Sequence, residues 1–300
     1  MELVYIGGLA LSGLTALLWA VHNVAIRLGT VRGGVTDAIT VVMVTNLVVI
    51  APTAVLVHYP GFGLSPLAVV VFAAAGVSGL MLGRICLFRG IRTIGASRTT
   101  PVVSASALVS AVLAVRFLGE TLTPRHGLGI VLIVGGVATI SWSTAADAVE
   151  KPSLREAWSA LLLPLGAALF IGIEPIFVRI GLDSGTPVLV GLSIMTAAAL
   201  LSHVVYHRVR GGRLYRPGRK VNLRWFVVAA LASTFGLTAY FLALQLAPVV
   251  VVIPIIQLSP LAVLAISAAF LPRELERVTW RLAVAASVVV VGAILVSLSG

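Results

Sequence analysis

The chain has 300 residues, of which 59% are hydrophobic and only 10% are charged. A soluble protein carries about a quarter charged residues, so this composition excludes a pair of soluble domains. The net charge is +11, but the basic residues lie in short connections between apolar runs, where they orient membrane spans, so no nucleic-acid partner is predicted.

Apolar runs follow one another along the whole chain. A helix needs about 20 residues to cross the hydrocarbon core, and lipid leaves no partner for exposed backbone groups. The runs lack the alternation of a membrane barrel, so they predict an all-α integral membrane protein with ten transmembrane helices. The predicted spans are 3–27, 36–58, 65–91, 97–118, 124–143, 157–180, 186–206, 223–246, 249–271 and 278–298.

The ends of the chain and its single cysteine add two expectations. Met1 is followed by Glu2 rather than by basic residues, so the first span is predicted to be a retained helix and not a signal peptide. Cys86, inside an apolar run, is the single cysteine. One cysteine excludes an intrachain disulfide and a cysteine-based metal motif.

The two halves of the sequence match each other. A gapless shift of 153 positions pairs glycine, proline and phenylalanine residues that apolar composition alone does not align, and a shift of 152 does the same in the first span. We therefore predict a first repeat over 1–145, a linker over 146–156 and a second repeat over 157–300. The matched pairs include Gly83 with Gly236, Phe88 with Phe241, Pro101 with Pro254, Arg27 with Arg179 and Gly29 with Gly181.

Each predicted repeat holds five spans. Because five is odd, two tandem copies enter the membrane from opposite sides, which gives two five-helix inverted-topology repeats. Many secondary transporters have this architecture and bind substrate near the membrane midplane between the halves.

Several segments resemble the EamA-type transporters of the drug/metabolite transporter superfamily. They are "LTALLWAVHNVAIRLG" in the first span, "GRICLFRGIRTIGASRTTPVVSASALVSAVLAVRFLGETLTPRHGLGIVLIVGG" across the third to fifth spans, and "GLTAYFLALQLAPVVVVIPIIQLSPLAVLAISAAFLPRELERVTWRLAVAASVVVVGA" in the second half. The "FLGE" that ends at Glu120 is among the most distinctive pieces, and the second half departs from it with "FLPRE".

The resemblance implies a ten-helix carrier that moves metabolites, amino acids or drug-like compounds, often outward and often coupled to protons. It implies a multi-pass protein of the cell membrane with membrane lipid and a small organic substrate as partners, as a monomer or homodimer. No cofactor and no enzymatic activity are expected.

The basic residues predict an orientation. The connections after the odd-numbered spans hold most of the lysines and arginines, whereas the opposite side holds only Arg116, Arg125 and Arg179. The positive-inside rule then places both termini outside the cell. The resemblance implies cytoplasmic termini instead, and the sequence leaves both orientations open.

Charged residues inside a span are the first candidates for function, since each costs about 2.5–3.5 kcal/mol at a helix centre. Glu174 is the one acidic residue deep in a span, directly before Pro175. It is a candidate for proton coupling or for anchoring a cationic substrate group. Arg84, inside the third span, is a candidate clamp for a carboxylate or phosphate, and the alternative is a structural pair with Glu174.

Polar and aromatic residues in four spans complete the candidate site. Trp19, His22 and Asn23 share the first span, and the shift of 152 places His22 opposite Glu174. Because histidine titrates near pH 6.5, the two side chains are a candidate proton-handling pair, although a core histidine that bonds a carbonyl is the alternative. Ser104, Gln257 and Tyr240 complete the eight main candidates, and bridging between helices is their structural alternative. Further polar candidates are Ser106, Ser110, Ser259 and Gln245.

Other functions find less support in the sequence. The chain has no GxxxxGK[ST] motif for ATP hydrolysis and no repeated filter motif typical of a channel. A single deep carboxylate is too few for the metal site of an intramembrane lipid-modifying enzyme. A secondary transporter of a small organic solute is the leading hypothesis, and a channel or a non-transporting scaffold is the alternative.

Overall fold

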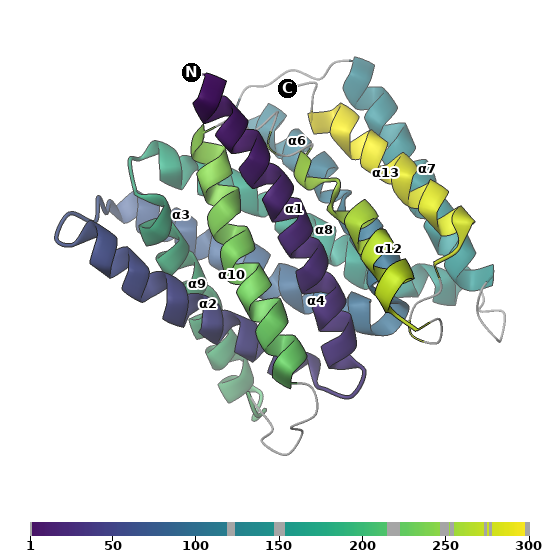
Figure 1. Ribbon diagram of the computed structural model, residues 1–300, viewed down its shortest axis with the longest axis horizontal. Helices are drawn as coiled ribbons and strands as arrows, with labels where there is room; N and C mark the ends of the chain where they lie inside the picture. Colours follow the sequence, from purple (N-terminus) through teal and green to yellow (C-terminus); the bar gives the residue numbers. More distant parts are fainter. Residues whose placement is uncertain are drawn as a thin grey trace.

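The computed structural model describes residues 2–118, 124–146, 154–214, 223–246, 252, 255–272, 275 and 278–297. Within these residues all regular structure is helical and no strand occurs (Figure 1). The all-α prediction is therefore confirmed for the described part of the chain. The "FLGE" ending at Glu120, the matched Pro254 and most of the predicted linker lie outside it.

The helices follow the predicted spans in order. In the first half they are α1 (Glu2–Thr30), α2 (Val35–His58), α3 (Pro66–Ala75), the π-helix η1 (Gly76–Gly83), α4 (Arg84–Ile94), α5 (Ala96–Val103), α6 (Ser106–Leu118) and α7 (Pro124–Ala146). In the second half they are α8 (Leu154–Asp183), α9 (Val188–Val209), α10 (Leu223–Leu246), α12 (Ser259–Phe270) and α13 (Trp280–Ser297).

Among the described residues, six helical segments are long and apolar enough to cross a membrane, and shorter apolar helices accompany them. These segments confirm a membrane protein with multiple spans, whereas the count of ten remains a prediction. The six segments are Ile6–Thr30, Val35–His58, Pro66–Ile94, Ser159–Asp183, Val188–Val209 and Leu223–Leu246.

Three predicted spans are not regular helices throughout. The span 97–118 was expected to be continuous, but it breaks at Ser104 and Ala105, three residues after Pro101, whose missing N–H removes a helical hydrogen bond. The span 249–271 has a turn at Gln257 and Leu258 before α12 begins. The span 65–91 contains the π-helical turn η1, a feature that is frequent at functional sites.

The glycines matched between the halves lie where helices approach closely. A Cβ at Gly29 of α1 would collide with the ring of Phe226 in α10, and a Cβ at Gly181 of α8 would collide with the ring of Phe72 in α3. In the matched pair Gly83 and Gly236, a Cβ at Gly83 would collide with a side chain of α8 and a Cβ at Gly236 would collide with a side chain of α1. Close packing therefore explains why glycine recurs at these positions.

Each half packs against the other half, and helices at corresponding positions make corresponding contacts. In the first half α1 packs on α10 and α12, whereas its counterpart α8 packs on α3, η1, α4 and α6. The counterparts α2 and α9 contact each other, as do α7 and α13. The two halves therefore interdigitate instead of forming separate lobes (Figure 1).

The two ends of the helical bundle differ in charge. The start of α1 and the end of α13 lie at one end, at the top of Figure 1. The opposite end carries the α1–α2 connection, the last turn of α4 and the end of α9. We call this the basic end, since its described residues include Arg27, Arg32, Arg89, Arg92, Arg208, Arg210 and Arg213.

Candidate functional site

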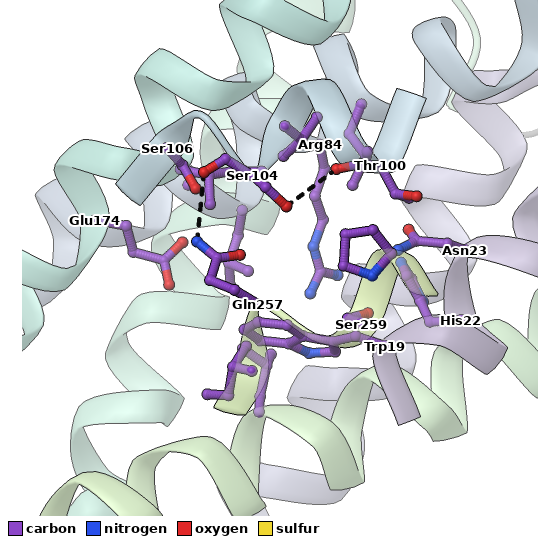
Figure 2. A pocket seen from close by; sticks show the side chains of 18 residues that line it. Trp19, His22, Asn23, Arg84, Thr100, Ser104, Ser106, Glu174, Gln257 and Ser259 are labelled. Atoms are coloured by element: carbon purple, nitrogen blue, oxygen red, sulfur yellow. Dashed lines mark hydrogen bonds between the residues drawn. The ribbon is translucent and has the colours of Figure 1, made fainter. Parts of the chain in front are cut away.

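A cavity of about 140 Å³ lies in the middle of the bundle, where α1, η1, α4, α5 and α8 meet the turn before α12 (Figure 2). Seven of the eight main candidate residues named from the sequence line it. The same walls include Ser106 and Ser259, which were further polar candidates, and Gly79 and Thr100, which were not candidates. The seven are Trp19, His22, Asn23, Arg84, Ser104, Glu174 and Gln257.

Arg84 begins α4 directly after the π-helical turn and is buried, with 7% of its surface exposed. Its Nη2 donates a hydrogen bond of 2.8 Å to the hydroxyl of Ser233 in α10. Its Nη1 is also buried and has no hydrogen-bond partner among the described residues. One side of the guanidinium is therefore held in place and the other remains available to a ligand.

A polar network that the sequence reasoning missed holds Arg84. Asn46 of α2 donates to the Ser233 hydroxyl at 3.2 Å and accepts a hydrogen bond of 2.8 Å from the Thr234 hydroxyl. Asn46 and Ser233 are fully buried, and 2% of Thr234 is exposed. The signal for this network was Asn46, an amide within an apolar run, because buried amides need partners.

Glu174 reaches the cavity from α8, and 7% of it is exposed. A Cβ at Gly79 in η1 would collide with the Glu174 carboxylate, so this glycine makes the room that the carboxylate occupies. The carboxylate forms no hydrogen bond and no ion pair with the described residues.

Arg84 and Glu174, for which a structural pair was the alternative, form no direct ion pair. Both side chains are described and no ion pair within 4.0 Å joins them, although both point into the cavity (Figure 2). Burying two charges without direct pairing is unfavourable. The two charges lie close enough to attract each other across the cavity without direct contact.

The aromatic and amide groups of α1 form another wall. His22 donates from Nδ1 to the carbonyl of Ala229 at 2.7 Å, which leaves Nε2 as the acceptor. The side-chain oxygen of Asn23 is buried without a hydrogen-bond partner among the described residues. Trp19 packs on Tyr240 with ring centroids 5.5 Å apart, and Tyr240 does not line the cavity itself.

The two helix interruptions meet at this site. Gln257 Nε2 donates to the carbonyl of Ser104 at 3.5 Å, across 153 positions of sequence. Interrupted helices at corresponding positions of two repeats mark the binding sites of many transporters, because they offer backbone groups to a ligand.

The cavity therefore offers one guanidinium, one carboxylate, amides and hydroxyls between apolar walls. A ligand that carries a negative and a positive group satisfies both buried charges at once. Among the described residues no group of three or more histidine, cysteine or acidic side chains is placed to hold a metal.

Comparison with known proteins agrees with this architecture. A solved structure described only as "Crystal structure of protein" is 19% identical and has a TM-score of 0.62, over 96% of this chain and 95% of that one. At this identity the likeness concerns the fold alone. A search of curated proteins finds no match. The EamA-like transporter family matches twice, over residues 6–142 and 158–298. The chain therefore belongs to the EamA-like transporter family, within the drug/metabolite transporter superfamily.

Proposed function

We propose that this protein is a secondary transporter that exports a small zwitterionic solute of the amino-acid type across the cell membrane. The observation that carries the proposal is that Arg84 and Glu174 are both buried in one cavity without a direct ion pair between them. Arg84 binds the carboxylate of the solute through its free Nη1, and Glu174 binds the ammonium group.

The cavity volume limits the size of the solute. About 140 Å³ is close to the roughly 150 Å³ of an engineered cavity that holds benzene. Trp19 and Leu87 add apolar surface beside the charges. Small amino acids therefore fit this conformation better than large drug-like cations do.

Alternating access follows from two inverted repeats of five helices each, which we propose for the chain. The exchange of helix contacts between the halves and the two interrupted helices at corresponding positions support this arrangement. Rocking of one half against the other then opens the central cavity to each side in turn.

Proton coupling follows from competition at one carboxylate. Glu174 cannot bind a proton and hold an ammonium group by charge at the same time. If protonation occurs when the cavity faces outward, it releases the solute there, and the proton leaves on the inward side. Exchange of one proton for one solute then drives export.

The orientation rests on the basic end, which the positive-inside rule places in the cytoplasm. Solute then enters the cavity from the basic end and leaves at the end where α1 begins.

Counterflow in liposomes tests the proposal. Purified protein is reconstituted with unlabelled L-alanine inside, and uptake of trace labelled L-alanine is followed. A carrier shows uptake stimulated by the internal unlabelled solute, whereas a channel or scaffold does not. Arg84→Gln is expected to abolish the stimulation. Its control, Arg179→Gln, removes an exposed arginine of α8 that pairs with Asp183 far from the cavity, and it is expected to leave counterflow intact.

If neither L-alanine, L-serine nor glycine gives counterflow while the protein remains folded, the zwitterion assignment is wrong. If all uptake is insensitive to internal solute, transport by a carrier is wrong.

A further inference from the structure

A second cavity, of about 740 Å³, opens at the basic end, between the start of α2, the last turns of α4 and the end of α9. It shares no lining residue with the central cavity. Three arginines line it, Arg89 and Arg92 from α4 and Arg213 after α9, together with His207. We call it the basic vestibule.

The three guanidinium groups of the basic vestibule are unsatisfied. None of them forms a hydrogen bond or an ion pair with the described residues. Arg89 and Arg92 are exposed three residues apart on one face of α4, so their charges point into the same space. Repulsion between convergent cations is unfavourable unless an anion lies between them.

Several other arginines in the described part of the chain contact protein groups. Arg210 lies over the ring of Tyr206 at 5.0 Å, and Arg224 lies over Trp225 at 5.4 Å. Arg27 donates to the carbonyls of Arg92 and Leu275 at 2.9 and 2.7 Å. The positive-inside rule explains why arginines gather at this end, but it does not explain why these three converge unpaired on one cavity.

The start of α2 adds further donors. Gly34 precedes the helix and offers no capping side chain, and the first helical hydrogen bond runs from Ala38 to Gly34. The N–H groups of Val35 and Thr36, both lining residues, therefore have no partner within the helix. Asp37 is the one carboxylate in the lining, and it accepts a hydrogen bond of 3.3 Å from the Gly34 N–H.

We propose that the basic vestibule binds a phosphate-bearing anion. Guanidinium groups bind phosphate through paired hydrogen bonds, and a helix N-terminus favours the same ligand. The volume exceeds that of a bare ion and fits the headgroup of an anionic phospholipid. Two sources share this chemistry, a lipid headgroup and a soluble phosphate, and the experiment separates them.

The test is a titration of the detergent-purified full chain with three probes. These are short-chain phosphatidylglycerol, short-chain phosphatidylcholine and inorganic phosphate, and the readouts are saturable binding and the rise in Tm. The double variant Arg89→Gln/Arg92→Gln is expected to lose at least about tenfold in affinity, since charge-assisted hydrogen bonds are lost. The charge-matched control Arg208→Gln/Arg210→Gln, at the end of α9 and outside the cavity lining, is expected to keep its affinity.

If phosphatidylglycerol binds saturably and inorganic phosphate does not bind, the vestibule is a lipid site. If both bind, it is a site for soluble phosphate as well. Either result supports the proposal if binding is lost in the double variant alone. Equal affinity for phosphatidylcholine, unchanged affinity in the double variant, or no binding of either anion overturns it. Because Arg89 and Arg92 are exposed, the double variant is expected to fold, and an unchanged Tm without probe checks this for each variant.

Discussion

At the scale of single residues, most of the candidates named from the sequence lie together around the central cavity. A carboxylate, a guanidinium and an imidazole inside apolar runs stood out because burying them is costly, and all three line the central cavity. The sequence did not predict that Arg84 is oriented by Ser233 and Asn46. Serine and asparagine in membrane helices usually bridge neighbours, so their chemistry alone did not identify this network.

Ser233→Ala tests the positioning of Arg84. The substitution removes a hydrogen bond from the charged guanidinium, worth about 1.5–3 kcal/mol, so affinity for L-alanine is expected to fall by about tenfold or more. The maximal rate of counterflow is expected to change less than the KM. Thr238→Ala is the control, because its hydroxyl bonds only a carbonyl of its own helix. Equal affinity in the two variants would contradict the positioning role.

Glu174→Gln tests proton coupling. The amide retains a carbonyl that accepts a hydrogen bond from an ammonium group, but it cannot exchange a proton. Counterflow is expected to persist with a raised KM, whereas uphill transport driven by a pH gradient is expected to be lost. Asp183→Asn, an exposed carboxylate at the end of the same helix, serves as the control. Proton-driven accumulation by Glu174→Gln would refute the assignment.

At the scale of helices, hydrophobic runs gave the order and the approximate ends of the elements, because helix length in a membrane is set by the bilayer. They did not give the interruptions. The break at Ser104 and the π-helical turn at Gly76–Gly83 depend on contacts with other helices, which a run of apolar residues does not encode. Pro101 was the local signal for the break at Ser104, and Gly79 and Gly83 lie within the π-helical turn.

Gly79→Ala tests the close approach of η1 and α8. The added methyl group collides with the Glu174 carboxylate, which is the flexible end of a side chain facing the cavity, so the carboxylate is expected to turn away at little cost in stability. Affinity for L-alanine is expected to fall by tenfold or more, because the carboxylate must move. The control Gly13→Ala in α1 meets no atom within 4 Å and is expected to bind normally. Normal binding by Gly79→Ala would show that the position of Glu174 is unimportant.

At the scale of the whole molecule, the internal sequence match of the two halves indicated helix contacts that composition alone did not indicate. Glycines at corresponding positions make corresponding helix contacts, which single-residue propensities do not foresee. The orientation in the membrane depends on the charge difference between the two ends. The sequence shows this difference directly, because Arg116, Arg125 and Arg179 are the only basic residues counted on the side opposite the basic end.

The charge difference predicts that both termini lie outside the cell. Reporters fused to either terminus that are active only outside the cytoplasm are expected to be active, and a reporter placed within 215–222 is expected to be active only in the cytoplasm. Cytoplasmic activity of the terminal fusions would reverse the orientation. It would also place the basic vestibule outside the cell.

The most direct test of the central cavity as a zwitterion site compares three ligands on the purified protein. Equilibrium binding is measured for L-alanine, for L-alanine methyl ester, which lacks the carboxylate, and for N-acetyl-L-alanine, which lacks the ammonium group. In the proposed binding mode Arg84 holds the carboxylate and Glu174 holds the ammonium group. L-alanine is therefore expected to bind, and each derivative is expected to bind at least about tenfold more weakly. Equal binding of either derivative would contradict the assignment of that charge, and equal binding of both would contradict the site.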